Sequence, residues 1–197
     1  QHELGAEFRN GMGDGGMLQP VMKFAGKYYL MENGKKLHFT STQALQENGY
    51  SDASSTLVGN WTNATREFGI VMPANNTFIK FKSSPSIYLY SNSGFYGFSS
   101  YESFLGWSGP SITTVLEGES SYNITPPTLA GTLLPLVKSA DGTISLLTYS
   151  KRYILTGAAV ADPRQITNTS TLPSINTLLQ ARPAQTVTAQ MQSRSQV

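Results

Sequence analysis

The chain has 197 residues, of which 39% are hydrophobic, so it holds enough apolar material for packed cores. Its formal net charge is only +2 and its basic residues form no clustered stripe, which argues against a nucleic-acid partner. The absence of cysteine excludes disulfide bridges, zinc–thiolate sites and a thiol nucleophile.

The chain begins with a segment, residues 1–19, that we expect to be flexible. Four glycines fall within Asn10–Gly16, and glycine loses more conformational freedom on ordering than any other residue. A first folded unit is predicted over residues 20–72. It opens on the apolar segment Val21–Phe24 and continues through the stretch Lys27–Tyr50.

Local signals in this first unit predict a hairpin followed by a short helix. Ala25-Gly26 and Asn33-Gly34 are turn pairs, and Asn-Gly favours the tight two-residue hairpin turn. The hydroxyls of Thr40-Ser41-Thr42 are suited to accept hydrogen bonds from the first free amides of a helix. The predicted helix covers about residues 42–48 and ends at Gly49.

The same pattern recurs twice further along the chain, which is typical of repeat proteins. Ser86–Gly109 aligns with Lys27–Tyr50 without a gap, at an offset of 59 positions. Its helix is predicted over about residues 101–106 and ends at Gly106. A more divergent third copy lies at Thr143–Val160. We therefore predict a second unit over 73–130, a degenerate third unit over 131–180 and a C-terminal tail over 181–197.

These units define the predicted fold: an α+β, β-rich chain of three tandem small antiparallel-sheet units, each with a short helix. Positions that stay apolar in all three copies are predicted to form the core face of the strands. They are 29/88/144, 31/90/146, 39/98/154 and 45/104/160. The opposite parity varies, as at 36/95/151 and 38/97/153, and is predicted to face outward.

No catalytic constellation is predicted, and the chain is expected not to be an enzyme. The two histidines are His2, in the flexible start, and His38, at a predicted outward strand position. Neither a zinc site nor a calcium loop can be assembled from the sequence, so no metal and no cofactor is expected. The acids considered for glycoside cleavage recur in none of the copies. They are Glu102, Glu117, Glu119, Asp141 and Asp162.

Aromatic side chains are the chemistry in which the chain is enriched. We expect six of them on the outer parity or in loops, where exposed rings can stack on sugars or fill pockets of a partner. The alternative is that each ring covers a neighbouring repeat, because a unit this small cannot bury its own face. The six candidates for ligand or partner binding are Tyr28, Tyr50, Phe95, Tyr101, Trp107 and Tyr153.

The first copy resembles a short hairpin-plus-helix repeat of bacterial extracellular and cell-wall surface proteins. In that repeat a Tyr-x-Leu strand and a Gly-Lys-Lys turn lead to a Phe-x-Ser strand end and a helix that closes on Gly-Tyr. The resemblance implies an accessory or surface module, and it carries over no catalytic residue. The matching residues are Tyr29, Leu30, Gly34, Lys35, Lys36, Phe39, Ser41, Gly49 and Tyr50.

Composition agrees with an extracellular or cell-surface location. Charged residues make up 13% of the chain, against about 25% in typical soluble proteins. Hydroxyl and amide side chains take the place of Lys and Glu, as is common on the exposed strands of secreted β proteins. No apolar run approaches the roughly 18 residues of a membrane-spanning helix.

The favoured function is therefore a non-catalytic extracellular or cell-surface structural or adhesion module, with self-assembly into a fibre or surface layer as one form. The first alternative is a carbohydrate- or cell-wall-binding accessory module of a larger secreted protein, which outer aromatics lining one shared groove would favour. The second alternative is a degenerate hydrolase domain, which requires His38 beside an acid and a hydroxyl. Expected partners are further copies of the chain, to which the tail is a candidate donated strand, other surface proteins, or cell-wall polysaccharide.

Overall fold

The structure, a computed structural model, describes residues 21–52, 56–57, 67–82, 84–110, 116–117, 127–157 and 163–188. The expected flexible segment 1–19 and the end of the expected tail, 189–197, lie outside these residues. The described part contains three sheets and a few short helices, which confirms the predicted α+β, β-rich fold. It divides into two compact units, of which the first holds the first sheet and the second holds the other two.

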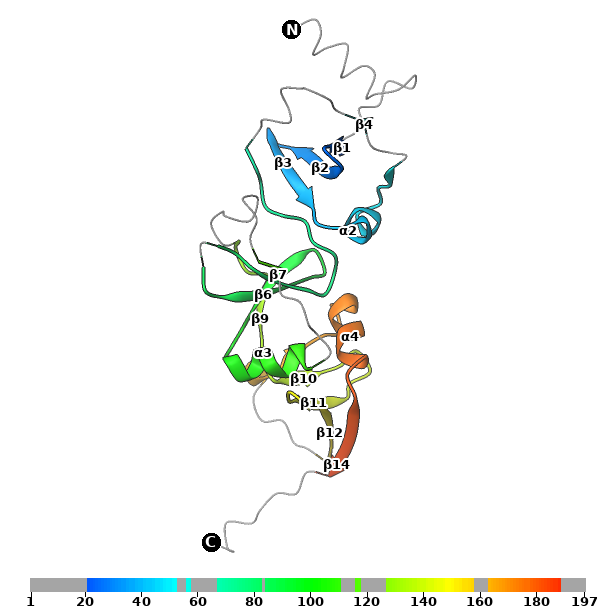
Figure 1. Cartoon of the computed structure of the whole chain (residues 1–197). Coiled ribbons are helices and arrows are strands. Elements are labelled where there is room, and N and C mark those ends of the chain that lie inside the picture. Colours follow the sequence, from blue (N-terminus) through cyan, green and yellow to red (C-terminus); the bar gives the residue numbers. More distant parts are fainter. Residues whose placement is uncertain are drawn as a thin grey trace, which may run out of the picture. The chain divides into compact units, whose positions relative to one another are not determined.

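The first sheet is a three-stranded antiparallel meander, and a fourth strand lies parallel to its first strand (Figure 1). Two-residue turns join the meander strands, and Ala25-Gly26 and Asn33-Gly34 all have the positive φ that such turns require. The helix begins after Ser41, whose Oγ accepts a hydrogen bond from the amide of Ala44 at 3.0 Å. The elements are β1 (Val21–Phe24), β2 (Lys27–Glu32), β3 (Lys35–Phe39), α2 (Thr42–Glu47) and β4 (Thr56–Leu57).

The chain that follows the first sheet returns along its third strand. Isolated bridges pair Lys36 with Phe68 and Phe39 with Met72 in the parallel direction. The amide of Met72 donates to the carbonyl of His38 at 2.8 Å. The strand β3 is therefore flanked on both edges, by β2 and by this returning segment.

The second and third sheets repeat this arrangement. The second consists of β5 (Thr77–Lys80), β6 (Ile87–Ser91), β7 (Gly94–Phe98), β8 (Leu116–Glu117) and β9 (Gly131–Leu133), with α3 (Tyr101–Ser108) after β7. The third consists of β10 (Leu136–Lys138), β11 (Ile144–Leu147), β12 (Arg152–Thr156), β13 (Thr167–Asn168) and β14 (Ala184–Thr188), with η4 (Pro163–Gln165) before β13 and α4 (Pro173–Gln180) after it. The strand orders are β8-β5-β6-β7-β9 and β13-β10-β11-β12-β14. In both sheets the two outermost strands lie parallel to their neighbours. Each sheet is thus an antiparallel meander with parallel strands at its edges.

The helix of the second repeat is longer than expected. It continues through Gly106 to Ser108 and ends at Gly109, so the prediction that Gly106 ends it is wrong. Gly106 instead allows α3 to approach β11 closely, because a Cβ at this position would lie 2.8 Å from the carbonyl oxygen of Leu147.

One hydrophobic core joins the second and third sheets within the second unit. The ring of Trp107 on α3 is 1% exposed, and Ile175 and Leu179 on α4 are fully buried in the same cluster. In Figure 1, α4 (orange) lies beside the third sheet. The two repeats therefore bury their apolar faces together. The remaining members of the cluster are Phe78, Leu89, Tyr96, Leu133, Val137 and Leu147.

In the second strand of each meander, the residues that pack in the core clusters have the parity opposite to the predicted one, although Tyr29, Tyr88 and Tyr90 are buried as predicted. A two-residue turn places Glu32 opposite Lys35, so Tyr28 faces Phe39 across the hairpin, whereas Tyr29 faces His38. Residues on one face therefore have even numbers on one side of the turn and odd numbers on the other. The prediction instead kept odd numbers, or even numbers, on one face in both strands. Tyr28 accordingly packs with Phe39 on the first core. The same exchange applies at Leu89 opposite Tyr96 and at Ser145 opposite Ile154.

The face predicted to be outward is also covered in the first sheet. Lys36 and His38 are 9% and 8% exposed. The ring of Phe68, from the returning segment, lies 4.5 Å from Lys36 Nζ and 6.2 Å from the ring of Tyr29. The returning segment therefore shields a face that a free meander would leave in solvent.

Part of the stretch expected as a tail, Ala184–Thr188, forms β14 and pairs in parallel with β12 (Figure 1). The carbonyl of Pro183 accepts a hydrogen bond from the amide of Arg152 at 2.7 Å, so the carbonyl of Pro183 points to β12. Because backbone directions alternate along a strand, those of Ala184 and Thr186 point away from β12. The outer edge of β14 pairs with no other strand in the described part of the chain.

Candidate functional site

An open groove lies on the second repeat, between the start of β6, the end of β7 and the first turn of α3. Its volume is 530 Å³, which falls within the range of about 300–1,000 Å³ typical of ligand sites. All the described side chains that line it are uncharged. The main lining residues are Ser86, Tyr88, Phe98, Ser100, Tyr101 and Phe104.

The junction between β7 and α3 brings three rings of the groove together. The Oγ of Ser100 accepts a hydrogen bond from the amide of Ser103 at 3.0 Å and so fixes the start of the helix. Tyr101 and Phe104 are three positions apart and share one helix face, with ring centroids 5.9 Å apart. Phe98 meets Phe104 edge-to-face at 5.4 Å.

These rings form a series that runs from the core to solvent. Phe78 is 1% exposed and stacks on Phe98 at 5.9 Å, with an interplanar angle of 6°. Phe98 and Phe104 are half-buried, and Tyr101 at the end of the series is 66% exposed. An exposed ring that is anchored in this way needs little further ordering when it contacts a ligand.

Of the six aromatic residues predicted to bind a partner, Tyr101 lines the groove. Trp107 and Phe95 do not face outward as predicted, since they are 1% and 6% exposed. Trp107 lies in the core of the second unit and donates its Nε1–H to the carbonyl of Leu134 at 2.8 Å. Phe95 packs edge-to-face on Tyr90 at 5.0 Å, because its face of the second sheet is covered.

The other three predicted aromatics are half-buried and lie elsewhere. Tyr28 and Tyr50 pack against the core of the first unit, with the ring of Tyr50 6.1 Å from that of Phe39. Tyr153 lies beneath Lys151, whose Nζ is 5.9 Å from the ring centroid. Their role in binding stays a prediction.

Sequence reasoning missed three residues of the groove: Tyr88, Phe98 and Phe104. All three were assigned to the core because they stay apolar in each copy. Phe104 follows Tyr101 by three positions, and this helical spacing was a signal that the two rings share a surface. No comparable local signal marks Tyr88 or Phe98, because they meet α3 only through the tertiary fold.

The candidate catalytic groups are not among the lining residues of the groove. His38 is 8% exposed and packs against the ring of Tyr29 at 5.4 Å, so its predicted outward position is wrong. Glu102 is exposed on α3. Asp141 Oδ1 accepts a hydrogen bond from the amide of Thr143 at 2.9 Å, and this bond lowers the pKa of Asp141.

His2, Glu119 and Asp162 lie outside the described residues, as does the side chain of Glu117. Within the described ranges, no group of three or more His, Asp and Glu side chains is placed to hold a metal ion.

Arg182 is an enclosed cation of the second unit. It is 5% exposed, and its Nη2 donates to the carbonyls of Thr148 and Tyr149, the latter at 3.2 Å. Burial lowers the pKa of Arg182. Gly109 makes room for the guanidinium, because a Cβ there would lie 1.2 Å from Nη1. The side chain therefore ties the turn after β11 to the chain that follows α4.

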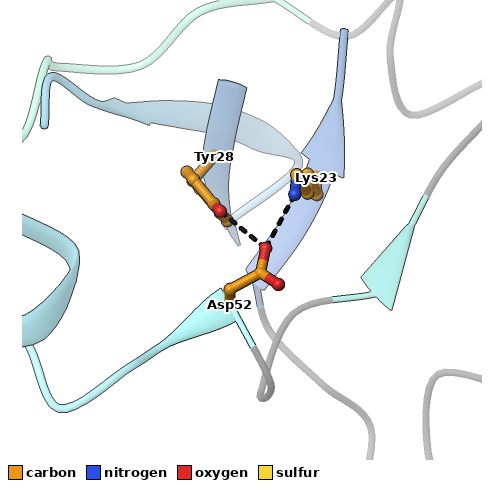
Figure 2. Close-up of polar contacts among 3 residues, drawn as sticks. All are labelled: Lys23, Tyr28 and Asp52. Carbon is orange, nitrogen blue, oxygen red and sulfur yellow. Dashed lines mark hydrogen bonds and ion pairs between the residues drawn. The ribbon is translucent and has the colours of Figure 1, made fainter. Parts of the chain in front are cut away.

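A polar cluster on the first sheet, like Arg182, contains side chains with shifted pKa values. Lys23 and Tyr28 are cross-strand partners on β1 and β2, and both bind one oxygen of Asp52, at 2.8 and 2.6 Å (Figure 2). The hydrogen bond to Lys23, followed by that to Tyr28, lowers the pKa of Asp52. The bond to Asp52 raises the pKa of both partners. A phenol with a raised pKa is a poorer nucleophile at neutral pH, so the cluster is suited to fastening residues 50–52 to the sheet.

We expect the carboxyl of Asp52 to titrate below its ordinary value of 3.8, and Tyr28→Phe to move its pKa back upward. Because this pKa is lowered on folding, the stabilisation is present above pH 3.8 and disappears as the pH falls through the folded pKa. Carbon-detected NMR titration of the carboxyl groups measures the shift. Asp141 serves as the control, since its partner is the amide of Thr143 and its pKa should not respond to the variant.

No protein-family model matches the chain, and no curated protein matches it in a sequence search. Among the helices in the described part of the chain, none has the length and apolar character needed to cross a bilayer.

Proposed function

We propose that the chain is a non-catalytic extracellular or cell-surface module with an adhesion role carried by the groove of the second repeat. The observation that supports this most directly is the ring of Tyr101, 66% exposed at the end of an anchored aromatic series. A ring in this position offers a large contact area to a partner at low cost in side-chain entropy. The lining residues in the described part of the chain include no carboxylate, imidazole or thiol, which supports a binding role for the groove.

The recurring sheets support the same proposal. Each meander is completed by strands from other parts of the chain, and the second and third sheets share one core. Repeats that stack in this way form a rigid scaffold on which a binding surface keeps its shape. The short loops and the helix α3 then place the groove at the surface of this scaffold.

Assembly into a fibre or surface layer is a second candidate, which the edge of β14 favours. The backbone groups of Ala184 and Thr186 point away from β12, and four of the five residues of the strand are exposed. An unpaired strand edge is a template for pairing with another chain. In this form the donated element is an edge that already belongs to the third sheet.

The degenerate hydrolase alternative finds less support. It requires His38 beside an acid and a hydroxyl in a cleft, whereas His38 is buried against Tyr29 and does not line the groove.

The adhesion role predicts that the purified chain sediments with insoluble cell-wall material and releases no soluble reducing sugar from it. Sedimentation followed by gel analysis measures the first, and a reducing-end assay of the supernatant measures the second. Failure to sediment would contradict adhesion to this partner, and release of sugar would contradict the non-catalytic role.

The same preparation tests the assembly candidate by light scattering and negative-stain imaging over a range of concentrations. Adhesion alone predicts a monomer throughout. Polymers that disappear in Thr186→Pro but persist in Thr186→Ala would establish assembly through the β14 edge. Proline removes an amide that points away from β12, so the pairing of β14 within its own sheet is expected to survive.

A further inference from the structure

We infer that the groove of the second repeat binds an uncharged saccharide chain, with sugar rings stacked on Tyr101 and its neighbours. This inference rests on the proposed adhesion role and gives it a ligand class. It is carried by the shape of the groove, the arrangement of its rings and the absence of charge among its described lining residues.

Part of the exposed apolar surface of the second unit lies at this groove. In the described part of the chain four large hydrophobic side chains are exposed, and two of them, Tyr101 (66%) and Leu129 (41%), line the groove. The half-buried rings of Phe98 and Phe104 lie directly behind Tyr101. Exposed apolar surface that gathers in a hollow marks a binding site more often than scattered single residues do.

The chemistry of the lining matches a sugar on both of its faces. The C–H face of a pyranose ring is apolar and packs on an aromatic ring, while its hydroxyls need donors and acceptors at the rim. Tyr101 supplies a ring and a phenolic hydroxyl, and Ser86 and Ser100 add aliphatic hydroxyls. The Oγ of Ser100 accepts a hydrogen bond from the amide of Ser103, and its hydroxyl hydrogen is left to donate to a ligand.

The absence of charge selects among ligands. Among the described residues no lysine or arginine lines the groove, so a phosphate polymer, a nucleic acid or an anionic glycan would find no counter-charge from them. A proline-rich peptide also binds aromatic-lined grooves, so it is titrated alongside the saccharides below. The hydroxyls of Ser86, Ser100 and Tyr101 lie beside the rings and match the many hydroxyls of a sugar. A neutral saccharide therefore fits the groove best.

The test is titration of the full chain with cellohexaose and chitohexaose, followed by ¹H–¹⁵N NMR and calorimetry. Hexagalacturonate and a proline-rich decapeptide are titrated in parallel. We expect one of the neutral hexaoses to shift resonances at the start of β6, the end of β7 and the start of α3. Tyr101→Ala should weaken this binding by about tenfold or more, because it removes the exposed stacking surface.

Tyr149→Ala is the matched control, since Tyr149 is also an exposed tyrosine of the second unit (54%) and does not line the groove. Equal losses in both variants, binding of the peptide or the charged glycan alone, or no response to either hexaose would overturn the inference. If the chain sediments with cell-wall material equally well in wild type and Tyr101→Ala, adhesion stands and the groove assignment fails. Shortening of the hexaoses would instead contradict the non-catalytic role.

Discussion

Replacing Gly109 by alanine is expected to lower the free energy of unfolding of the second unit by about 3–5 kcal/mol. Gly109 has φ 56° and ψ −176°, a backbone conformation that residues with a Cβ essentially never adopt. The new methyl group would also lie 1.2 Å from Nη1 of Arg182, which is buried and cannot move into solvent without disturbing its neighbours. Urea unfolding followed by circular dichroism measures the loss.

Two variants separate the backbone cost from the steric one. Gly142 also has a positive φ (87°), but a Cβ at this position would have no neighbouring atom within 4 Å, so Gly142→Ala should cost only about 1 kcal/mol. In an Arg182→Ala background, Gly109→Ala should lose the steric part of its effect. A cost at Gly109 no larger than that at Gly142 would show that the guanidinium yields freely and that the close contact is unimportant.

Replacing Trp107 by alanine is expected to destabilise the second unit by about 3–5 kcal/mol, the range found for removal of a large buried aromatic. Its ring is 1% exposed in the core that joins the second and third sheets, and its Nε1–H satisfies the carbonyl of Leu134. Hydrogen exchange should rise in β5 to β7, in β9 to β11 and in α4, which share this core. Exchange in β1 to β3 is the internal reference, because the core of the first unit contains none of these residues.

Tyr101→Ala on the same helix is the contrasting variant. Its ring is 66% exposed, so its removal should change the free energy of unfolding by less than about 0.5 kcal/mol. The two rings of α3 are thus expected to give opposite results, one affecting stability and the other saccharide binding. Similar losses of stability in both variants would contradict the assignment of Trp107 to the core and of Tyr101 to the groove.

The local parts of the fold could be predicted from the sequence because their signals are local. The Asn33-Gly34 turn, the helix cap within Thr40-Ser41-Thr42 and the recurrence of the meander are all present as expected. The face assignment was wrong in part, because the two- and four-residue connections within the meanders exchange the parity of residues that share a face. Three of the parallel edge strands, β4, β8 and β13, could not be predicted, since they are two residues long and gain their partners only in the folded chain.

The groove could be predicted only in part, for a related reason. Composition shows that aromatic residues are enriched, and Tyr101 was correctly expected to be exposed. Burial of the others depends on which repeat covers them. Trp107 resembled a surface ring while its partner sheet was unknown, and Phe98 resembled a core residue although it reaches the groove.

The position of β9 fixes an order of events during synthesis. This strand completes the second sheet at Gly131–Leu133, and the third sheet begins only a few residues later with β10 at Leu136. A chain that emerges N-terminus first cannot close the second sheet until it has delivered residues that lead directly into the third. The rings of Phe78 and Trp107 cannot be fully buried before the same residues are synthesised, because Leu133 and Val137 belong to their core. An emerging chain that stalls before residue 131 would present these rings to chaperones, and release of the next few residues would withdraw them.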